Sequence, residues 1–152
     1  MKLDTLAGSI GKGIIAGLVG TAAMTVSSTI EAKLRGRMFS TAPADAARKA
    51  LGIREFESDR AKSRFSDLVH WGYGTAWGVV HGMLRGVGVP STLATPVHGA
   101  VIWGSATVML PAFGVAPPVY LWGRKEVAID VWHHAVYAAA TGIAYQLIDR
   151  RD

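Results

Sequence analysis

Four long stretches of the chain contain no Asp, Glu, Lys or Arg: residues 13–30, 68–84, 86–123 and 131–148. A helix that crosses the hydrocarbon core of a membrane needs about 20 mainly apolar residues. Three stretches have about that length, and the longer third one divides into a turn, a span and a Pro-rich exit. The pattern predicts a single membrane domain over residues 1–152, with spans near residues 13–30, 66–84, 97–113 and 130–148.

A soluble four-helix bundle is the alternative to a membrane bundle. Each of its helices would carry a polar stripe with a period near 3.6 residues. Residues 13–30 and 97–113 show no such stripe, because their polar residues are Ser, Thr, Gly and a single His. Half of all residues are hydrophobic and only 18% are charged. We therefore predict an all-α, polytopic membrane protein, and the lack of cysteine excludes disulfides and thiolate metal sites.

The first loop, residues 31–65, has the signals of partial order. Within "TAPADAARKALG", Pro43 suits a first helical position, Asp45 a first turn, and Gly52 a stop. We expect a short amphipathic helix here, at the level of the lipid headgroups. Ser58 is a suitable N-cap for a charged helical turn that leads into the second span.

The distribution of Lys and Arg predicts the orientation. Eleven lie in the first and third loops, and five lie on the side of the termini: Lys2, Lys12, Arg85, Arg150 and Arg151. The positive-inside rule places the first loop in the cytoplasm and both termini outside. Topology and anionic lipid headgroups thus account for the net charge of +5. The lipid bilayer is the expected partner, and nucleic acid is not.

Small residues predict how the spans pack. In "HWGYGTAWGVVHGM" (residues 70–83), a helix places two histidines on the same face as three glycines spaced by four. Such small-xxx-small faces let helices approach closely in lipid. The predicted packing residues are Gly13, Gly17, Gly74, Gly78, Gly82, Ala138 and Gly142. We expect these faces to join the spans and to meet a protein partner or a second copy of the chain.

The histidines fall at two depths of the predicted bundle. Because the spans alternate in direction, His70 lies level with His133 or His134, and His81 lies level with His98. The inner level also gathers carboxylates. Asp67 precedes His70 by three residues and Asp130 precedes His133 by three, so each pair shares a helix face. Glu31 ends the first span at the same level.

Three interpretations of these residues remain open. The first is structural, with each Asp orienting a His. The second is a b-type cytochrome, because histidine pairs at two depths on glycine-faced helices suit two haems. The third is a dinuclear metal site of the Glu-x-x-His kind, although the acid here is Asp and the third span offers none. The candidate haem or metal ligands are His70, His81, His98, His133, His134, Asp67, Asp130 and Glu31. We expect the structural role, without catalysis or cofactor.

Three segments resemble a known family. "GIIAGLVGTAAMT", "LPAFGVAPP" and "EVAIDVWHHAVYAAATGIAYQLI" look like the corresponding parts of the YagU-like proteins, small proteins of the bacterial inner membrane. The resemblance covers about two thirds of the chain. It implies a four-span protein of the bacterial cytoplasmic membrane that acts as an accessory subunit or in membrane stress, with acid tolerance as the associated phenotype.

Overall fold

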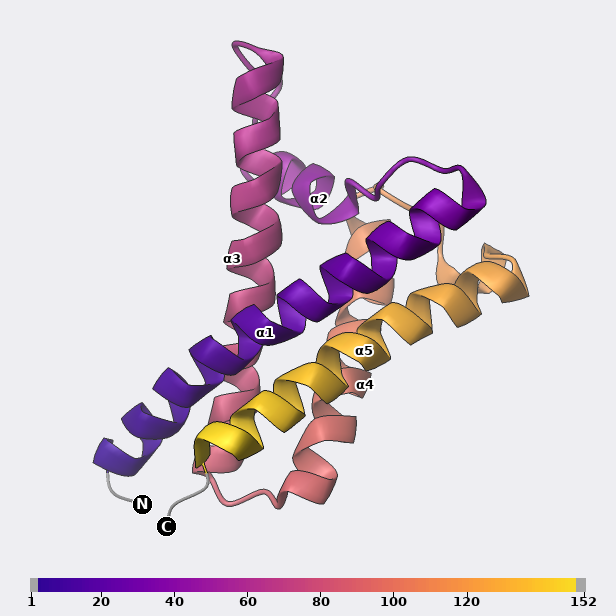
Figure 1. The fold of residues 1–152 in the computed structure, drawn as a ribbon. Helices are drawn as coiled ribbons and strands as arrows, with labels where there is room; N and C mark the ends of the chain where they lie inside the picture. Colours follow the sequence, from indigo (N-terminus) through magenta and orange to yellow (C-terminus); the bar gives the residue numbers. More distant parts are fainter. Residues whose placement is uncertain (1–2, 150–152) are drawn as a thin grey trace.

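The computed structural model describes residues 3–149, which form five α-helices and one short 3-10 turn without any strand (Figure 1). The elements are α1 (Leu3–Arg35), α2 (Ala42–Ala50), α3 (Asp59–Gly86), α4 (Ser91–Ala112), η1 (Val119–Leu121) and α5 (Arg124–Asp149). The all-α prediction is therefore confirmed for the described residues.

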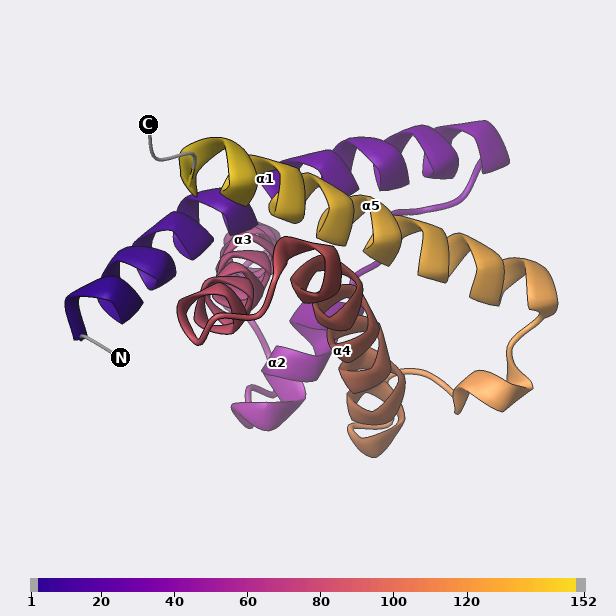
Figure 2. The ribbon, with the colours of Figure 1, turned by 90° about the horizontal axis from the view of Figure 1, so that it is seen from below.

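The four long helices surround a small interior. α1 and α5 lie side by side and run in opposite directions, and α3 crosses α1 obliquely (Figures 1 and 2). α4 packs mainly on α5, while α2 lies against α3 and the end of α4. Successive long helices alternate in direction, so both chain ends lie at one end of the bundle (Figure 1). The loops after α1 and after α4 lie at the opposite end.

α1 is longer than the apolar stretch that predicted it. The predicted span covers residues 13–30, whereas the helix has 33 residues. The additional turns carry Asp4 at the start and Lys33 and Arg35 at the end. Those charges complement the helix dipole. Gly36, with a φ of 62°, then ends the helix in a backbone conformation that glycine adopts without strain.

α4 begins at Ser91, six residues before the predicted start of the third span at residue 97. The reversal before it is short: Gly88 has a φ of 91°, and the Pro90 carbonyl accepts the first helical hydrogen bonds. Pro96 lies in the second turn, where it lacks the N–H that would bond four residues back. The helix continues past this missing hydrogen bond to Ala112.

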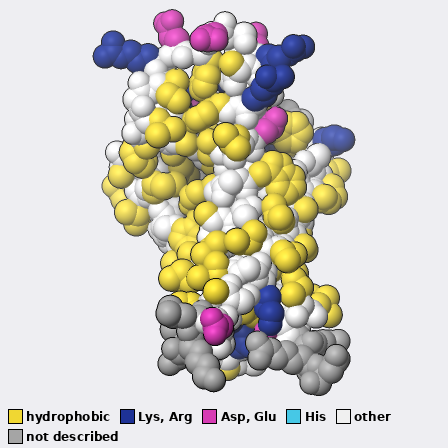
Figure 3. Space-filling view, turned by 90° about the vertical axis from the view of Figure 1, so that its left-hand side faces the viewer, with side chains coloured by type: hydrophobic (Ala, Val, Ile, Leu, Met, Phe, Trp, Pro, Cys, Tyr) yellow, Lys and Arg dark blue, Asp and Glu magenta, His cyan; other side chains and the backbone are white. Residues whose placement is uncertain are grey.

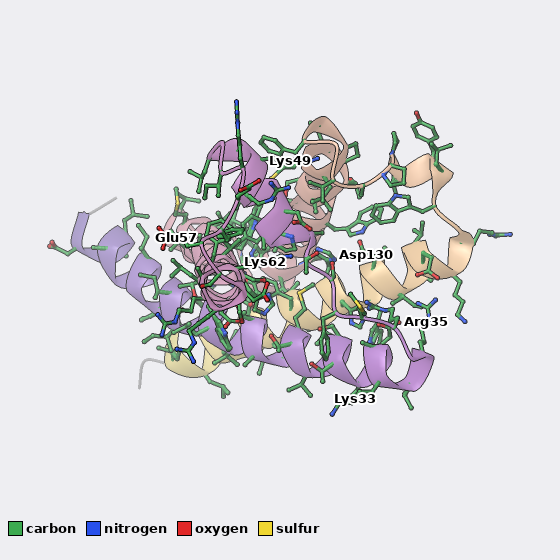
Figure 4. All side chains as sticks on the ribbon, turned by 90° about the horizontal axis from the view of Figure 1, so that it is seen from above. Lys33, Arg35, Lys49, Glu57, Lys62 and Asp130 are labelled. Carbon is green, nitrogen blue, oxygen red and sulfur yellow. The ribbon has the colours of Figure 1, made fainter. Side chains whose placement is uncertain are left out.

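The first loop contains the predicted short helix. α2 has a proline in its first turn, and Gly52 follows it with a φ of 67°. Ser58 caps α3, since its hydroxyl accepts a 3.2 Å hydrogen bond from the Ala61 amide. Lys49 attaches α2 to the end of α4, because its Nζ donates to the Phe113 and Gly114 carbonyls at 2.9 and 2.7 Å (Figure 4).

Large apolar side chains point outward and polar ones point inward. The largest fully buried side chains are Tyr137, Tyr145, His81, His98 and Thr141. Meanwhile Ile15, Val26 and Val108 are 52%, 59% and 72% exposed. In Figure 3, hydrophobic side chains cover the middle of the visible face and the charged ones gather toward both ends. This distribution is the reverse of a soluble core, in which Ile, Val and Leu are the residues most often buried.

Two of the described helices, α1 and α4, are long and apolar enough to cross a membrane. Only 28% and 17% of their apolar windows are buried, so neither resembles the core helix of a soluble protein. α3 and α5 do not meet the same criterion. Their apolar segments are rich in Gly, His, Trp and Tyr, which lowers their hydropathy. Length and composition therefore support membrane association, with two candidate spans.

Candidate functional site

Glycine replaces side chains where α1 crosses α3. A Cβ on Gly17 would lie 2.8 Å from the Gly78 Cα, and one on Gly13 would collide with the Gly78 carbonyl. Gly82 faces Gly13 in the same way, and Gly74 faces Thr21. The two backbones are thus in direct contact over two helical turns. Five of the predicted packing residues meet at this crossing.

The other two predicted packing residues lie between α5 and α4. Gly142 faces the Thr95 side chain, and the Ala138 Cβ would be 3.0 Å from a Cβ on Gly99. All seven predicted packing residues therefore contact helices of the same chain. Among the described helical glycines, only Gly8, Gly11, Gly72 and Gly104 have open space around them. A partner that uses the predicted glycine faces would have to displace a helix of this bundle.

A polar stripe on α5 faces the interior. His133, Tyr137, Thr141 and Tyr145 are spaced by four residues, and all are buried. The Tyr137 hydroxyl donates a 2.5 Å hydrogen bond to the Gly74 carbonyl of α3. The tyrosines and Thr141 are not among the residues predicted from the sequence. The signal that identifies them is the fourfold spacing from His133, which is also the spacing of the glycine faces.

His81 and His98 meet in the middle of this interior. Their ring centroids are 5.1 Å apart in an edge-to-face arrangement. The Tyr145 ring lies 5.3 Å from His81, and the Tyr137 ring lies 5.6 Å from His98. His98 Nε2 donates to the Trp77 carbonyl at 2.9 Å. The Nδ1 atoms of both histidines are buried and have no hydrogen-bond partner among residues 3–149.

His70 and His133 bind α1 instead of each other. His70 Nε2 shares a 2.8 Å hydrogen bond with the Thr25 hydroxyl, and His133 Nδ1 shares one of 3.0 Å with the Ser27 hydroxyl. The inner-level histidine pair expected from depth is therefore not formed. Depth along a helix does not determine which helix lies beside it, and here the side chains of α1 occupy the place between α3 and α5. His134 Nδ1 instead bonds the Asp130 carbonyl.

The two Asp-x-x-His pairs do not converge. Asp130 accepts a 2.9 Å hydrogen bond from the Trp103 indole of α4, and the Asp67 side chain is exposed. Glu31 lies 3.7 Å from His133 Nε2 but bonds primarily to Arg37 and Arg35. The hydrogen bond from Arg37, together with that from Arg35, lowers the pKa of Glu31 to about 2. The carboxylates thus link helices and the first loop.

An ion-pair cluster closes each end of the bundle. At the end away from the termini, Arg35 bonds Glu31 at 3.0 Å and Glu126 of α5 at 2.6 Å. At the other end, Asp149 accepts from Lys12 at 2.6 Å and from Arg85 at 3.4 Å. The Lys12 hydrogen bond lowers the pKa of Asp149. Both clusters join α1 to α5, and the second also includes α3.

The arrangement of these side chains does not support the haem hypothesis or the dinuclear metal hypothesis. The His81 and His98 rings are in direct contact, so a porphyrin could enter between them only if α3 and α4 moved apart. Within residues 3–149, no group of three or more His, Asp and Glu side chains is arranged to hold a metal ion. The polar side chains form hydrogen bonds between helices.

Comparisons of the chain with known protein families, curated proteins and solved structures give no match. The resemblance to the YagU-like proteins therefore rests on the sequence motifs alone. The features of the molecule that bear on its function are the outward apolar surface, the polar interior and the charged ends.

Proposed function

We propose that the chain is an integral protein of the bacterial cytoplasmic membrane in which α1, α3, α4 and α5 each cross the bilayer. The observation that carries this proposal is the inverted distribution of side chains, with His, Thr, Tyr and Gly inside and large apolar residues outside. Water would penalise that surface, whereas lipid accepts it, and polar groups in spans normally turn toward the bundle interior.

The distance between the two ion-pair clusters supports four crossings. From Lys12 to Glu31, α1 rises by about 28 Å at 1.5 Å per residue. The hydrocarbon core of a bilayer is about 30 Å thick. On α5 the two clusters lie somewhat farther apart, because Glu126 and Asp149 are separated by 23 residues, or about 35 Å. α3 and α4 connect the same two ends in opposite directions (Figure 1). The Lys and Arg distribution favours a cytoplasmic first loop and termini outside.

The proposed role is that of a non-catalytic accessory or membrane-stress protein, as the YagU-like motifs imply. The hydrogen bonds that the interior polar groups form between helices support this non-catalytic role. Tyr137 bonds the α3 backbone, His70 and His133 bond hydroxyls of α1, and Asp130 bonds the Trp103 indole of α4. Each of these groups joins two helices, which is a structural use of polarity in a membrane.

Two measurements test this proposal in sequence. Bacterial membranes carrying the protein are washed with alkaline carbonate, and the pellet and supernatant are compared. An integral protein stays in the pellet, and complete release would refute membrane integration. The protein is then purified in mild detergent with its mass measured. Co-purification of a defined membrane protein supports the accessory role, whereas a strictly monomeric species from its native membrane, without a partner, contradicts it.

A further inference from the structure

A groove of about 490 Å³ runs between α1 and α5, next to the Arg35–Glu126 ion pair. Its walls are mainly apolar, with Ile30 and Leu34 on α1 and Ile129 and Trp132 on α5. Leu34 and Trp132 are 82% and 62% exposed. Ile30 is 54% exposed as well. Arg35 and Lys125 lie at the charged end of the groove.

Polarity changes along the groove in a definite order. Ile30 and Trp132 lie toward the middle of the bundle, and Lys33, Arg35 and Lys125 lie toward its end. Under the proposed topology this is the boundary between hydrocarbon and headgroups on the cytoplasmic side. An acyl chain followed by a headgroup has the same order. Exposed tryptophans are also enriched at this boundary.

The charge at the end of the groove favours an anion. Residues 31–37 of α1 and the loop after it, with residues 124–126 of α5, carry five cationic side chains and two carboxylates. Arg35 forms hydrogen bonds with both carboxylates, Glu31 and Glu126, and Arg37 forms an ion pair with Glu31. Among the described residues, Lys33, Arg124 and Lys125 make no ion pair. Figure 4 shows Arg35 between α1 and α5, with Lys33 directed away from α5.

We infer that this groove binds one acyl chain of an anionic phospholipid, with the phosphate held by Lys125 at the charged end. The inference rests on the proposed membrane function and adds a specific lipid to it. Basic sites between spans on the cytoplasmic side recognise anionic headgroups by this chemistry. The apolar wall is continuous with the cationic rim, and this argues for a lipid. A soluble anion would contact only the rim, and an apolar helix would contact only the wall.

The test uses the full-length protein in detergent, titrated with dioleoyl-phosphatidylglycerol or dioleoyl-phosphatidylcholine, with bound lipid counted by native mass spectrometry. We expect phosphatidylglycerol to bind more tightly than phosphatidylcholine. Lys125→Gln should weaken phosphatidylglycerol binding by about five-fold, the effect of one cation near an anionic headgroup. Ala128→Trp, which fills the groove from α5, should weaken both lipids. Lys62→Gln removes the same charge from α3, far from the groove, and should leave binding unchanged.

Three outcomes overturn the inference. They are equal binding of the two lipids by the unaltered protein, equal effects of Lys125→Gln and Lys62→Gln, and displacement of phosphatidylglycerol by glycerol 3-phosphate as effectively as by lipid. The last would assign the site to a soluble phosphate. Carbonate extraction separates this result from the proposed function, because a protein that stays in the membrane without preferring phosphatidylglycerol refutes the lipid site alone.

Discussion

The Tyr137 hydroxyl of α5 donates a 2.5 Å hydrogen bond to the Gly74 carbonyl of α3, with the Gly20 backbone of α1 packed beside the Tyr137 ring. Three helices meet at this contact. It depends on glycine twice, because a Cβ on Gly20 would press on Tyr137 and one on Gly74 would collide with Thr21. The glycine faces and the polar stripe are therefore parts of one packing arrangement.

Tyr137→Phe tests the polar part of that arrangement. The substitution removes the hydroxyl and leaves the ring, so it should lower the free energy of unfolding by about 1 kcal/mol, near the net worth of one hydrogen bond. Thermal unfolding in detergent measures it. Tyr120→Phe is the matched control, because Tyr120 is 81% exposed and should tolerate the change. Equal effects of the two substitutions would show that the interior hydroxyl contributes nothing.

Gly78→Ala tests the glycine crossing. The new methyl would collide with the Gly13 carbonyl and the Gly17 backbone, so α1 and α3 must separate. Overpacking of this kind costs about 1–3 kcal/mol. Gly72→Ala lies on the same helix with open space around it and should stabilise the protein by about 0.5–1 kcal/mol, as is usual for glycine in a helix. Stabilisation by both substitutions would contradict the close approach.

Glu31 should make stability depend on acidity. Its pKa is lowered from 4.5 to about 2 in the folded protein, so its contribution is complete above pH 4.5 and is lost as the pH falls toward 2. The melting temperature should fall over that window, and by less in Glu31→Gln. Part of the fall in melting temperature should remain in Glu31→Gln, because the pKa values of Glu126 and Asp149 are also lowered. Glu57→Gln is the control, because Glu57 makes no ion pair among the described residues. An unchanged profile for Glu31→Gln would refute this role.

The purified protein should be colourless. After expression with adequate haem supply we expect no Soret band, because His81 and His98 contact each other directly and His98 Nε2 is already hydrogen-bonded. Absorption spectroscopy measures this, and metal analysis of the same sample should find no stoichiometric metal. A Soret band that disappears in His81→Ala would establish the haem interpretation instead.

The sequence predicts where the helices form better than it predicts which helices lie next to each other. Charge-free stretches located the long helices, and Pro43, Gly52 and Ser58 located α2 and the start of α3, because these signals act within a few residues. The sequence assigns the first residues of α4 to the turn before the third span, although the helix begins at Ser91 and includes Pro96. Local signals thus predict where the helices form, but not the first residue of α4.

The interior was harder to predict because it depends on how helices cross. Depth alone placed His70 with His133 or His134, but Thr25 and Ser27 of α1 take both partners. The fourfold spacing of Gly13, Gly17 and Thr21 on α1, and of Tyr137 and Thr141 on α5, carries the missing information. Ridges spaced by four residues favour oblique crossings, which bring α1 between α3 and α5.

The most direct test of the central claim, that α3 crosses the membrane as well as the more apolar α1, is single-cysteine labelling. The natural chain has no cysteine, so Thr5→Cys, Ser40→Cys and Val87→Cys each give one reporter. They lie at the N-terminal end, in the first loop and after α3. A membrane-impermeant maleimide is applied to spheroplasts before and after lysis. Crossing of the membrane by α1 and α3 predicts that Thr5→Cys and Val87→Cys label in intact spheroplasts and Ser40→Cys only after lysis. Labelling of Ser40→Cys and Val87→Cys from the same side would leave α3 outside the bilayer and contradict the account.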